Sequence, residues 1–223
     1  MRFPGNSPGA SPGDDDRRLA RRTVQLFTGL VMYGTGMALM IVSGLGLTSW
    51  DVFHQGLSEV TGLSFGLVVV LAGIPILLLW IPLRQRPGFG TVANLIVVGF
   101  VVDGALLVLP QHSPLWARVG YLVAGIAVIG AGTGLYIGAR FGPGPRDGLM
   151  TGLVARFPRL SIRLVRTAVE LVVLGTGWLL GGTVGIGTIA FALAIGPLAQ
   201  LFIPMFTIGV DRPRTGTALT PAH

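Results

Sequence analysis

Long runs of apolar residues dominate the pattern of the chain. Six of these runs approach the roughly 20 residues that an α-helix needs to cross a bilayer core of about 30 Å. They lie at residues 23–43, 65–83, 91–110, 119–139, 164–181 and 187–208. The pattern therefore predicts an all-α membrane protein with six transmembrane helices.

The segments after the first and fourth runs are predicted to contain short broken helices. Glycine and proline end both runs, because proline removes a backbone donor and clashes with the preceding helical turn. A short helix is expected to begin near Ser49 and another near Pro145, since proline suits the first turn of a helix. The N–H groups at these two helix starts carry partial positive charge and favour anions.

The two halves of the chain match each other when one is shifted along the other. An offset of 96 residues pairs Asp51 with Asp147, and after one inserted residue an offset of 97 pairs several glycines and threonines. Residues 23–110 and 119–208 thus form two three-helix repeats. Because each repeat has an odd number of spans, the second is expected to enter the membrane from the opposite side. Inverted repeats of this kind are common in transporters.

Composition agrees with a membrane location. Only 11% of the residues are charged, less than half the share of about 25% that is usual in soluble domains. The mean hydropathy is +0.74. The net charge of +7 does not indicate nucleic-acid binding, because the arginines form short blocks between apolar runs, as in topogenic loops.

The arginine blocks predict an orientation in the membrane. Four arginines precede the first run, the loop at 44–64 has none, and loops rich and poor in arginine alternate from there on. Both termini should therefore be cytoplasmic. Residues 1–22, rich in Pro, Gly and Ser near their start, are predicted to be a disordered cytoplasmic tail, and residues 209–223 a second cytoplasmic tail.

The two helix breaks are the candidate solute site. The acids Asp51 and Asp147 have two interpretations: they cap their own short helices, or the two segments meet near the midplane and frame a solute. Arg146 could pair with Asp147, bind an anionic solute or act as a topogenic charge. The residues predicted to bind substrate are Trp50, Asp51, His54, Asn94, Arg146, Asp147 and Gln200.

Two acids lie inside predicted spans. A charged side chain in a membrane helix costs at least about 2.5 kcal/mol, so it normally faces the protein interior or water. Asp103 has no basic neighbour in its helix, and we predict that it couples proton movement to transport. Glu170 follows Arg166 by one helical turn, which predicts a structural ion pair.

Several kinds of chemistry are not expected. The chain has no cysteine, and its three histidines lack metal-ligand spacing. It also lacks a P-loop and a Rossmann fingerprint. We therefore predict no enzymatic activity, no cofactor and no metal, with the lipid bilayer and a small solute as partners. Whether the chain forms a homo-oligomer or joins a larger membrane complex stays open.

Three motifs resemble a known family. They are WDVFHQGL at residues 50–57, RQRPGFGT at 84–91 and GPGPRDGLM at 142–150. These segments resemble the bacterial membrane proteins of the YczE/YyaS/YitT type, over about residues 23–208. The resemblance implies a bacterial inner-membrane protein and leaves the substrate open. Leu47-Thr48-Ser49 departs from the Gly-Pro that precedes Trp-Asp in that family.

These features favour a secondary transporter or exporter of a small solute. A solute with an anionic group would suit the positive starts of the two short helices. Two alternatives stay open. The chain could be a non-transporting membrane partner, such as the substrate-binding subunit of a larger complex, or it could be a passive channel.

Overall fold

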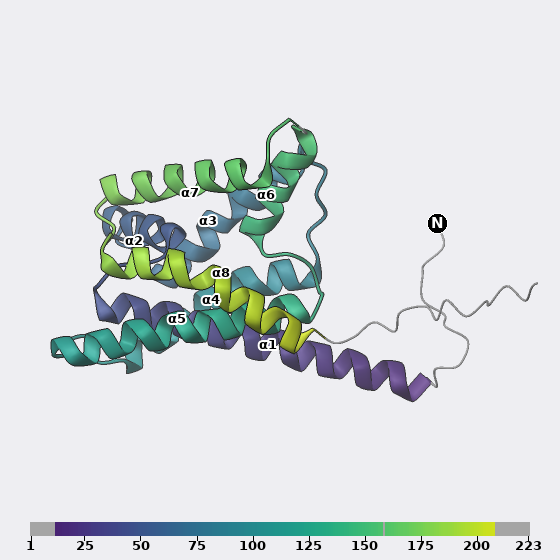
Figure 1. The fold of residues 1–223 in the computed structure, drawn as a ribbon, viewed down its shortest axis with the longest axis horizontal. Coiled ribbons are helices and arrows are strands. Elements are labelled where there is room, and N and C mark those ends of the chain that lie inside the picture. Colours follow the sequence, from purple (N-terminus) through teal and green to yellow (C-terminus); the bar gives the residue numbers. More distant parts are fainter. Residues whose placement is uncertain (1–11, 158, 208–223) are drawn as a thin grey trace, which may run out of the picture.

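The computed structural model describes residues 12–157 and 159–207, and this part of the chain is all-helical (Figure 1). Its eight helices are α1 (Pro12–Ser43), α2 (Ser49–Thr61), α3 (Phe65–Leu79), α4 (Phe89–Val108), α5 (Leu115–Gly138), α6 (Pro145–Arg156), α7 (Ile162–Leu179) and α8 (Ile186–Phe206). The six predicted apolar runs correspond to α1, α3, α4, α5, α7 and α8. The short helices α2 and α6 begin at Ser49 and Pro145, where the sequence predicted them.

The start of α1 differs from the prediction. The helix begins at Pro12, so residues 12–22 are helical rather than a disordered tail. Proline is well suited to a first helical turn, and the leucine, alanine and arginines that follow favour helix. Residues 1–11 and the predicted tail at 209–223 lie outside the described residues.

Four helices are long and apolar enough to cross a membrane, by length and composition: α1 from Asp16, α4, α5 and α8. The bent pair α2 and α3, with 110° between its helices, would be a fifth if it forms one broken span. Helix α7 carries Arg163, Arg166 and Glu170, which lower its apolar character. The described residues therefore define an all-helical protein with several membrane-length helices.

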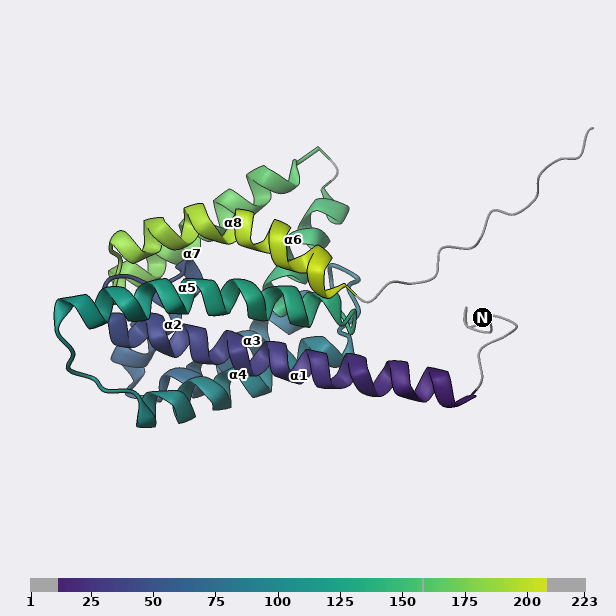
Figure 2. The same ribbon diagram turned by 60° about the horizontal axis from the view of Figure 1, so that its bottom comes forward.

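A close antiparallel contact between α1 and α5 joins the two halves of the chain. Figure 2 shows these helices running side by side, with α4 flanking α1 and α8 flanking α5. A Cβ atom on Gly29 would lie 2.9 Å from the Gly132 carbonyl oxygen, and one on Gly125 would lie 2.9 Å from that of Gly36. Such contacts are possible only where small residues let two backbones approach, as is common between membrane helices.

Two arginines cap the C-terminal ends of these helices from the opposite half. The guanidinium of Arg22 in α1 donates from Nε to the Ala139 carbonyl oxygen at 2.9 Å. Arg118 in α5 donates from Nε to the Ser43 carbonyl oxygen at 2.6 Å. The last carbonyls of a helix lack partners within it, and a cation there also suits the helix dipole. These arginines thus have a capping role in addition to their place in the loop charge pattern.

Each helix break is bonded to the start of the last helix in the other half. The Leu45 carbonyl oxygen accepts a hydrogen bond from the Gly187 N–H at 2.8 Å, and the Phe141 carbonyl oxygen accepts one from the Gly90 N–H at 3.0 Å. The four residues form two pairs that the sequence offsets of 96 and 97 relate to each other. The breaks are therefore fixed by tertiary contacts and not by their local sequence alone.

Substitution of Gly29 by leucine should test the α1–α5 contact. The new side chain would collide with α5, so we expect destabilisation by about 1–3 kcal/mol, the usual cost of overpacking. The measurement is thermal unfolding of the purified protein in detergent. Gly120→Leu is the matched control, because no atom lies within 4 Å of a Cβ at that position. Equal unfolding temperatures for the two variants would contradict the packing described.

Candidate functional site

A cavity of about 470 Å³ lies among the helices, and all eight contribute to its lining. This volume falls in the range of about 300–1,000 Å³ that is typical of small-molecule sites. We call it the central cavity. Its polar and aromatic-polar lining consists of Tyr33, Thr48, Trp50, His54, Asn94, Thr133, Tyr136, Arg146, Asp147, Arg166 and Glu170.

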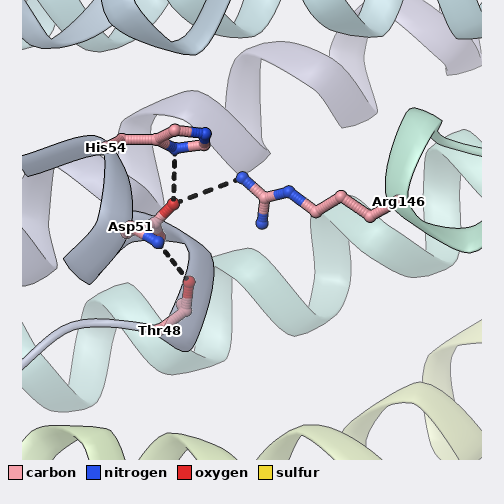
Figure 3. Close-up of polar contacts among 4 residues, drawn as sticks. All are labelled: Thr48, Asp51, His54 and Arg146. Atoms are coloured by element: carbon pink, nitrogen blue, oxygen red, sulfur yellow. Dashed lines mark hydrogen bonds and ion pairs between the residues drawn. The ribbon is translucent and has the colours of Figure 1, made fainter. Parts of the chain in front are cut away.

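An ion pair joins the two short helices beside the central cavity. Arg146 of α6 reaches Asp51 of α2, with 3.4 Å between the Arg146 Nη2 and Asp51 Oδ1 atoms (Figure 3). The Asp51 side chain is 1% exposed and the Arg146 side chain 23%. Because a buried charge without a partner is costly, this pair ties the two halves together at the site.

The surroundings of Asp51 leave its carboxylate free for this pair. Thr48 caps α2, since its Oγ1 accepts a hydrogen bond from the Asp51 N–H at 3.3 Å. His54 Nδ1 lies 3.6 Å from Asp51 Oδ1. The Tyr136 hydroxyl of α5 donates a hydrogen bond to Oδ2 of Asp147 in α6 at 3.3 Å. Thr48, and not Asp51, therefore fills the capping role at the start of α2.

Contacts with the rest of the fold position the first turn of α6. The Trp80 indole, at the end of α3, lies where a Cβ atom on Gly148 would have to be. Its N–H donates a hydrogen bond to the Pro145 carbonyl oxygen at 3.2 Å. Glycine at 148 thus lets the indole pack against α6, and this contact fixes the start of the helix from which Arg146 extends.

Three buried polar atoms at the site have no hydrogen-bond partner among the described residues: Trp50 Nε1, Asp51 Oδ2 and His54 Nδ1. The Arg146 guanidinium carbon lies 5.1 Å from the centre of the Trp50 ring. An unpaired buried polar group costs about 1–3 kcal/mol, so such groups call for an explanation. A ligand or water in the central cavity would explain the unpaired Trp50 N–H if it accepted a hydrogen bond from it.

The structure brings most of the predicted substrate-binding residues together. Those that line the central cavity are Trp50, His54, Asn94, Arg146 and Asp147. Asp51 lies behind them and reaches the cavity through Arg146. Gln200 does not line the cavity and is exposed on α8, where the neighbouring Ala199 takes the inward position.

Asp103 has the contacts of a helix cap. Its Oδ2 accepts a hydrogen bond from the Ser64 hydroxyl at 2.6 Å, and its Oδ1 accepts one from the Gly66 N–H at 2.6 Å. These bonds tie α4 to the start of α3. Asp103 is absent from the cavity lining, so the lining does not support its predicted role in proton coupling.

Arg166 and Glu170 both line the central cavity. The ion pair predicted between them is not among those formed by residues 12–157 and 159–207. The central cavity is also lined by Tyr33, Thr133 and Tyr136, which were not predicted from the sequence. Polar side chains among the glycines of the first and fourth apolar runs were the signal that could have found them.

In the described part of the chain, no group of three or more His, Cys, Asp or Glu residues could hold a metal ion.

The helices of membrane length and the apolar outer surface define an integral membrane protein of the all-helical class. The chain belongs to a family of unknown function (DUF6198), whose model matches residues 20–204. This membership confirms the resemblance to proteins of the YczE and YyaS type.

Three relatives match most of the chain. It is 40% identical over 178 residues to an uncharacterized protein of Haemophilus influenzae, across 80% of this chain and 81% of that protein. It is 31% identical over 190 residues to the uncharacterized membrane protein YczE of Bacillus subtilis, across 84% and 88%. It is 29% identical over 181 residues to the uncharacterized protein YyaS of the same species, across 79% and 90%. No solved structure matches.

Removing either partner of the ion pair should have unequal effects on stability. Arg146→Gln leaves a buried carboxylate unpaired and should cost about 3 kcal/mol. Asp51→Asn should cost less, because Arg146 can turn toward the central cavity. The double variant should recover part of the loss, since it leaves no unpaired charge.

Thermal unfolding in detergent measures these effects as a double-mutant cycle. Arg159→Gln is the control, because Arg159 is exposed and does not line the cavity. Additive losses in the double variant would mean that the two side chains do not interact.

Proposed function

We propose that the chain is a secondary transporter or exporter of a small solute that binds in the central cavity through an anionic group. The observation that carries this proposal is the meeting of two helix starts, one from each half, at the Arg146–Asp51 pair beside a cavity. Arg146 keeps N–H groups beyond its contact with Asp51, and the Trp50 N–H has no hydrogen-bond partner in the part of the chain that the structure describes. Both groups are suited to bind a carboxylate or phosphate.

The proposed membrane arrangement has six spans in two inverted repeats. The matched glycine contacts, arginine caps and bonded helix breaks of the two halves support it. In this arrangement α3 and α7 also span. Helix α7 has 18 residues and is therefore about 27 Å long at 1.5 Å per residue, close to the thickness of a bilayer core. Its charged residues would face the central cavity and not lipid.

We further propose that the protein lies in a bacterial inner membrane with both termini cytoplasmic. The arginines at the start of α1, ahead of its apolar run, and those in the loops after α3 and α5 support this orientation. The relatives from Haemophilus influenzae and Bacillus subtilis support a bacterial source.

A thermal-shift screen followed by flux measurements tests the transport proposal. Purified protein is screened against organic acids, amino acids, vitamins and inorganic anions. A ligand at 100 times its dissociation constant should stabilise the fold by about 2.7 kcal/mol. Arg146→Gln should abolish the shift, whereas Arg159→Gln should not.

Flux of the bound solute into liposomes then separates the alternatives. Saturable uptake that is lost in Arg146→Gln supports a carrier. Uptake that rises linearly with concentration would indicate a channel. Binding without flux would indicate a substrate-binding subunit of a larger complex, and the transport proposal would then be wrong.

A further inference from the structure

The two halves of the chain differ where their last two helices meet. In the first half, α3 packs closely on α4, and a Cβ atom on Gly66 would collide with the Gly99 carbonyl oxygen. One on Gly73 would collide with the Leu95 side chain. The α3 face that contacts α4 is thus small and apolar, and this side of the central cavity is closed.

In the second half, α7 carries charges at the matching positions. The offset of 97 residues places Arg163, Arg166 and Glu170 opposite Gly66, Val69 and Gly73. Helix α7 packs against α2 and α6, and α8 packs against α5 (Figure 1). Among the described helices, no comparable contact joins α7 to α8.

The facing side of α8 is correspondingly open. Ala192 and Gly196 are exposed and line the central cavity, whereas their counterparts in α4, Leu95 and Gly99, are buried. Charged side chains on α7 explain the difference, because a charged face cannot pack dry against an apolar helix. The α7–α8 side of the cavity is therefore less closely packed than the α3–α4 side.

Among the described residues, Glu170 is the acid of this face without a hydrogen-bond or ion-pair partner. Arg166 precedes Glu170 by one turn, and this order is the less favourable one for an ion pair along a helix. No ion pair between them is formed in the described residues. Asp147, the other acid in the lining, already accepts a hydrogen bond from Tyr136. Glu170 is thus available to a ligand.

The lining carries charges of both signs, and Asp51, outside the lining, already pairs with Arg146. Arg146 and Arg166 supply two positive charges, and Asp147 and Glu170 supply two negative charges. A purely anionic solute would pair with Arg146 but would leave Glu170 without a partner. A solute that carries both charges pairs with both groups.

We infer that the solute is a dipolar ion of the amino-acid type, whose carboxylate binds Arg146 and the Trp50 N–H and whose ammonium group binds Glu170. This inference rests on the proposed function, which supplies the carboxylate site. It adds Glu170 as a residue that determines specificity. The role predicted for Glu170 from sequence was a structural ion pair.

Three matched sets of compounds test the inference on the purified full chain. They are the free L-amino acids, their N-acetyl derivatives, which lack the ammonium charge, and their amides, which lack the carboxylate. Dissociation constants are measured by calorimetry or thermal shift. At least one free amino acid should bind at least tenfold more tightly than both of its derivatives.

Glu170→Gln should remove the preference for the free amino acid over its N-acetyl derivative. Glu59→Gln should keep it, because Glu59 is an exposed acid of α2 outside the cavity lining. The comparison of the three sets on the unaltered protein stands even if the Glu170 variant does not fold.

Two outcomes would overturn the inference and separate it from the proposed function. If an N-acetyl derivative bound as tightly as the free amino acid, and if its binding depended on Arg146, Glu170 would have no role in recognition. The proposed carrier of an anionic solute would still stand. Equal binding of an amide would also remove the carboxylate site and so contradict both proposals. Binding of none of the three sets would reject the dipolar ion, and the wider anion screen would then decide the proposed function alone.

Discussion

The fold depends on the need to bond the backbone at two helix breaks within an apolar environment. Unpaired N–H and C=O groups are too costly there, so irregular backbone survives only where protein or water supplies partners. Here the break after α1 bonds to the start of α8 through Leu45 and Gly187, and the break after α5 bonds to the start of α4 through Phe141 and Gly90. The backbone at each break therefore takes a hydrogen bond from the other half of the chain. The starts of α2 and α6, which follow the two breaks, meet at the Arg146–Asp51 pair.

Function in this account comes from the places where the two halves differ. The shared contacts build a symmetric frame, but Arg146 of one half stands where the other has Trp50, and Glu170 stands where the other has Gly73. The first difference places a cation against an indole ring, 5.1 Å from its centre. The second difference opens the cavity between α7 and α8. If the two halves were identical in sequence, the chain would lack both the contact of Arg146 with Trp50 and the opening between α7 and α8.

The sequence was informative wherever the signal was local. Apolar runs and helix-breaking residues predicted the helices, and shared residues at the breaks pointed to the site. Contacts between distant segments could not be predicted in the same way. Asp103 reads as a lone charge in an apolar run, and only the packing of α3 on α4 shows it as a cap. Gln200 was predicted to bind substrate, but on α8 it is Ala199 and not Gln200 that lines the central cavity. Arg22 and Arg118 are 96 residues apart in the sequence, as the repeat requires. Their capping of the ends of α5 and α1, however, depends on the contact between these two helices.

The most direct test of this account is the reactivity of two single cysteines in a chain that has none of its own. Ala199 in α8 lines the central cavity, and its counterpart in α4, Val102, is 0% exposed against α3 and its neighbours. Modification of the folded protein by a small water-soluble thiol reagent is followed by mass spectrometry. The account predicts rapid modification of Ala199→Cys and protection of Val102→Cys. Equal rates, or faster modification at 102, would contradict a cavity that is open at α7–α8 and closed at α3–α4.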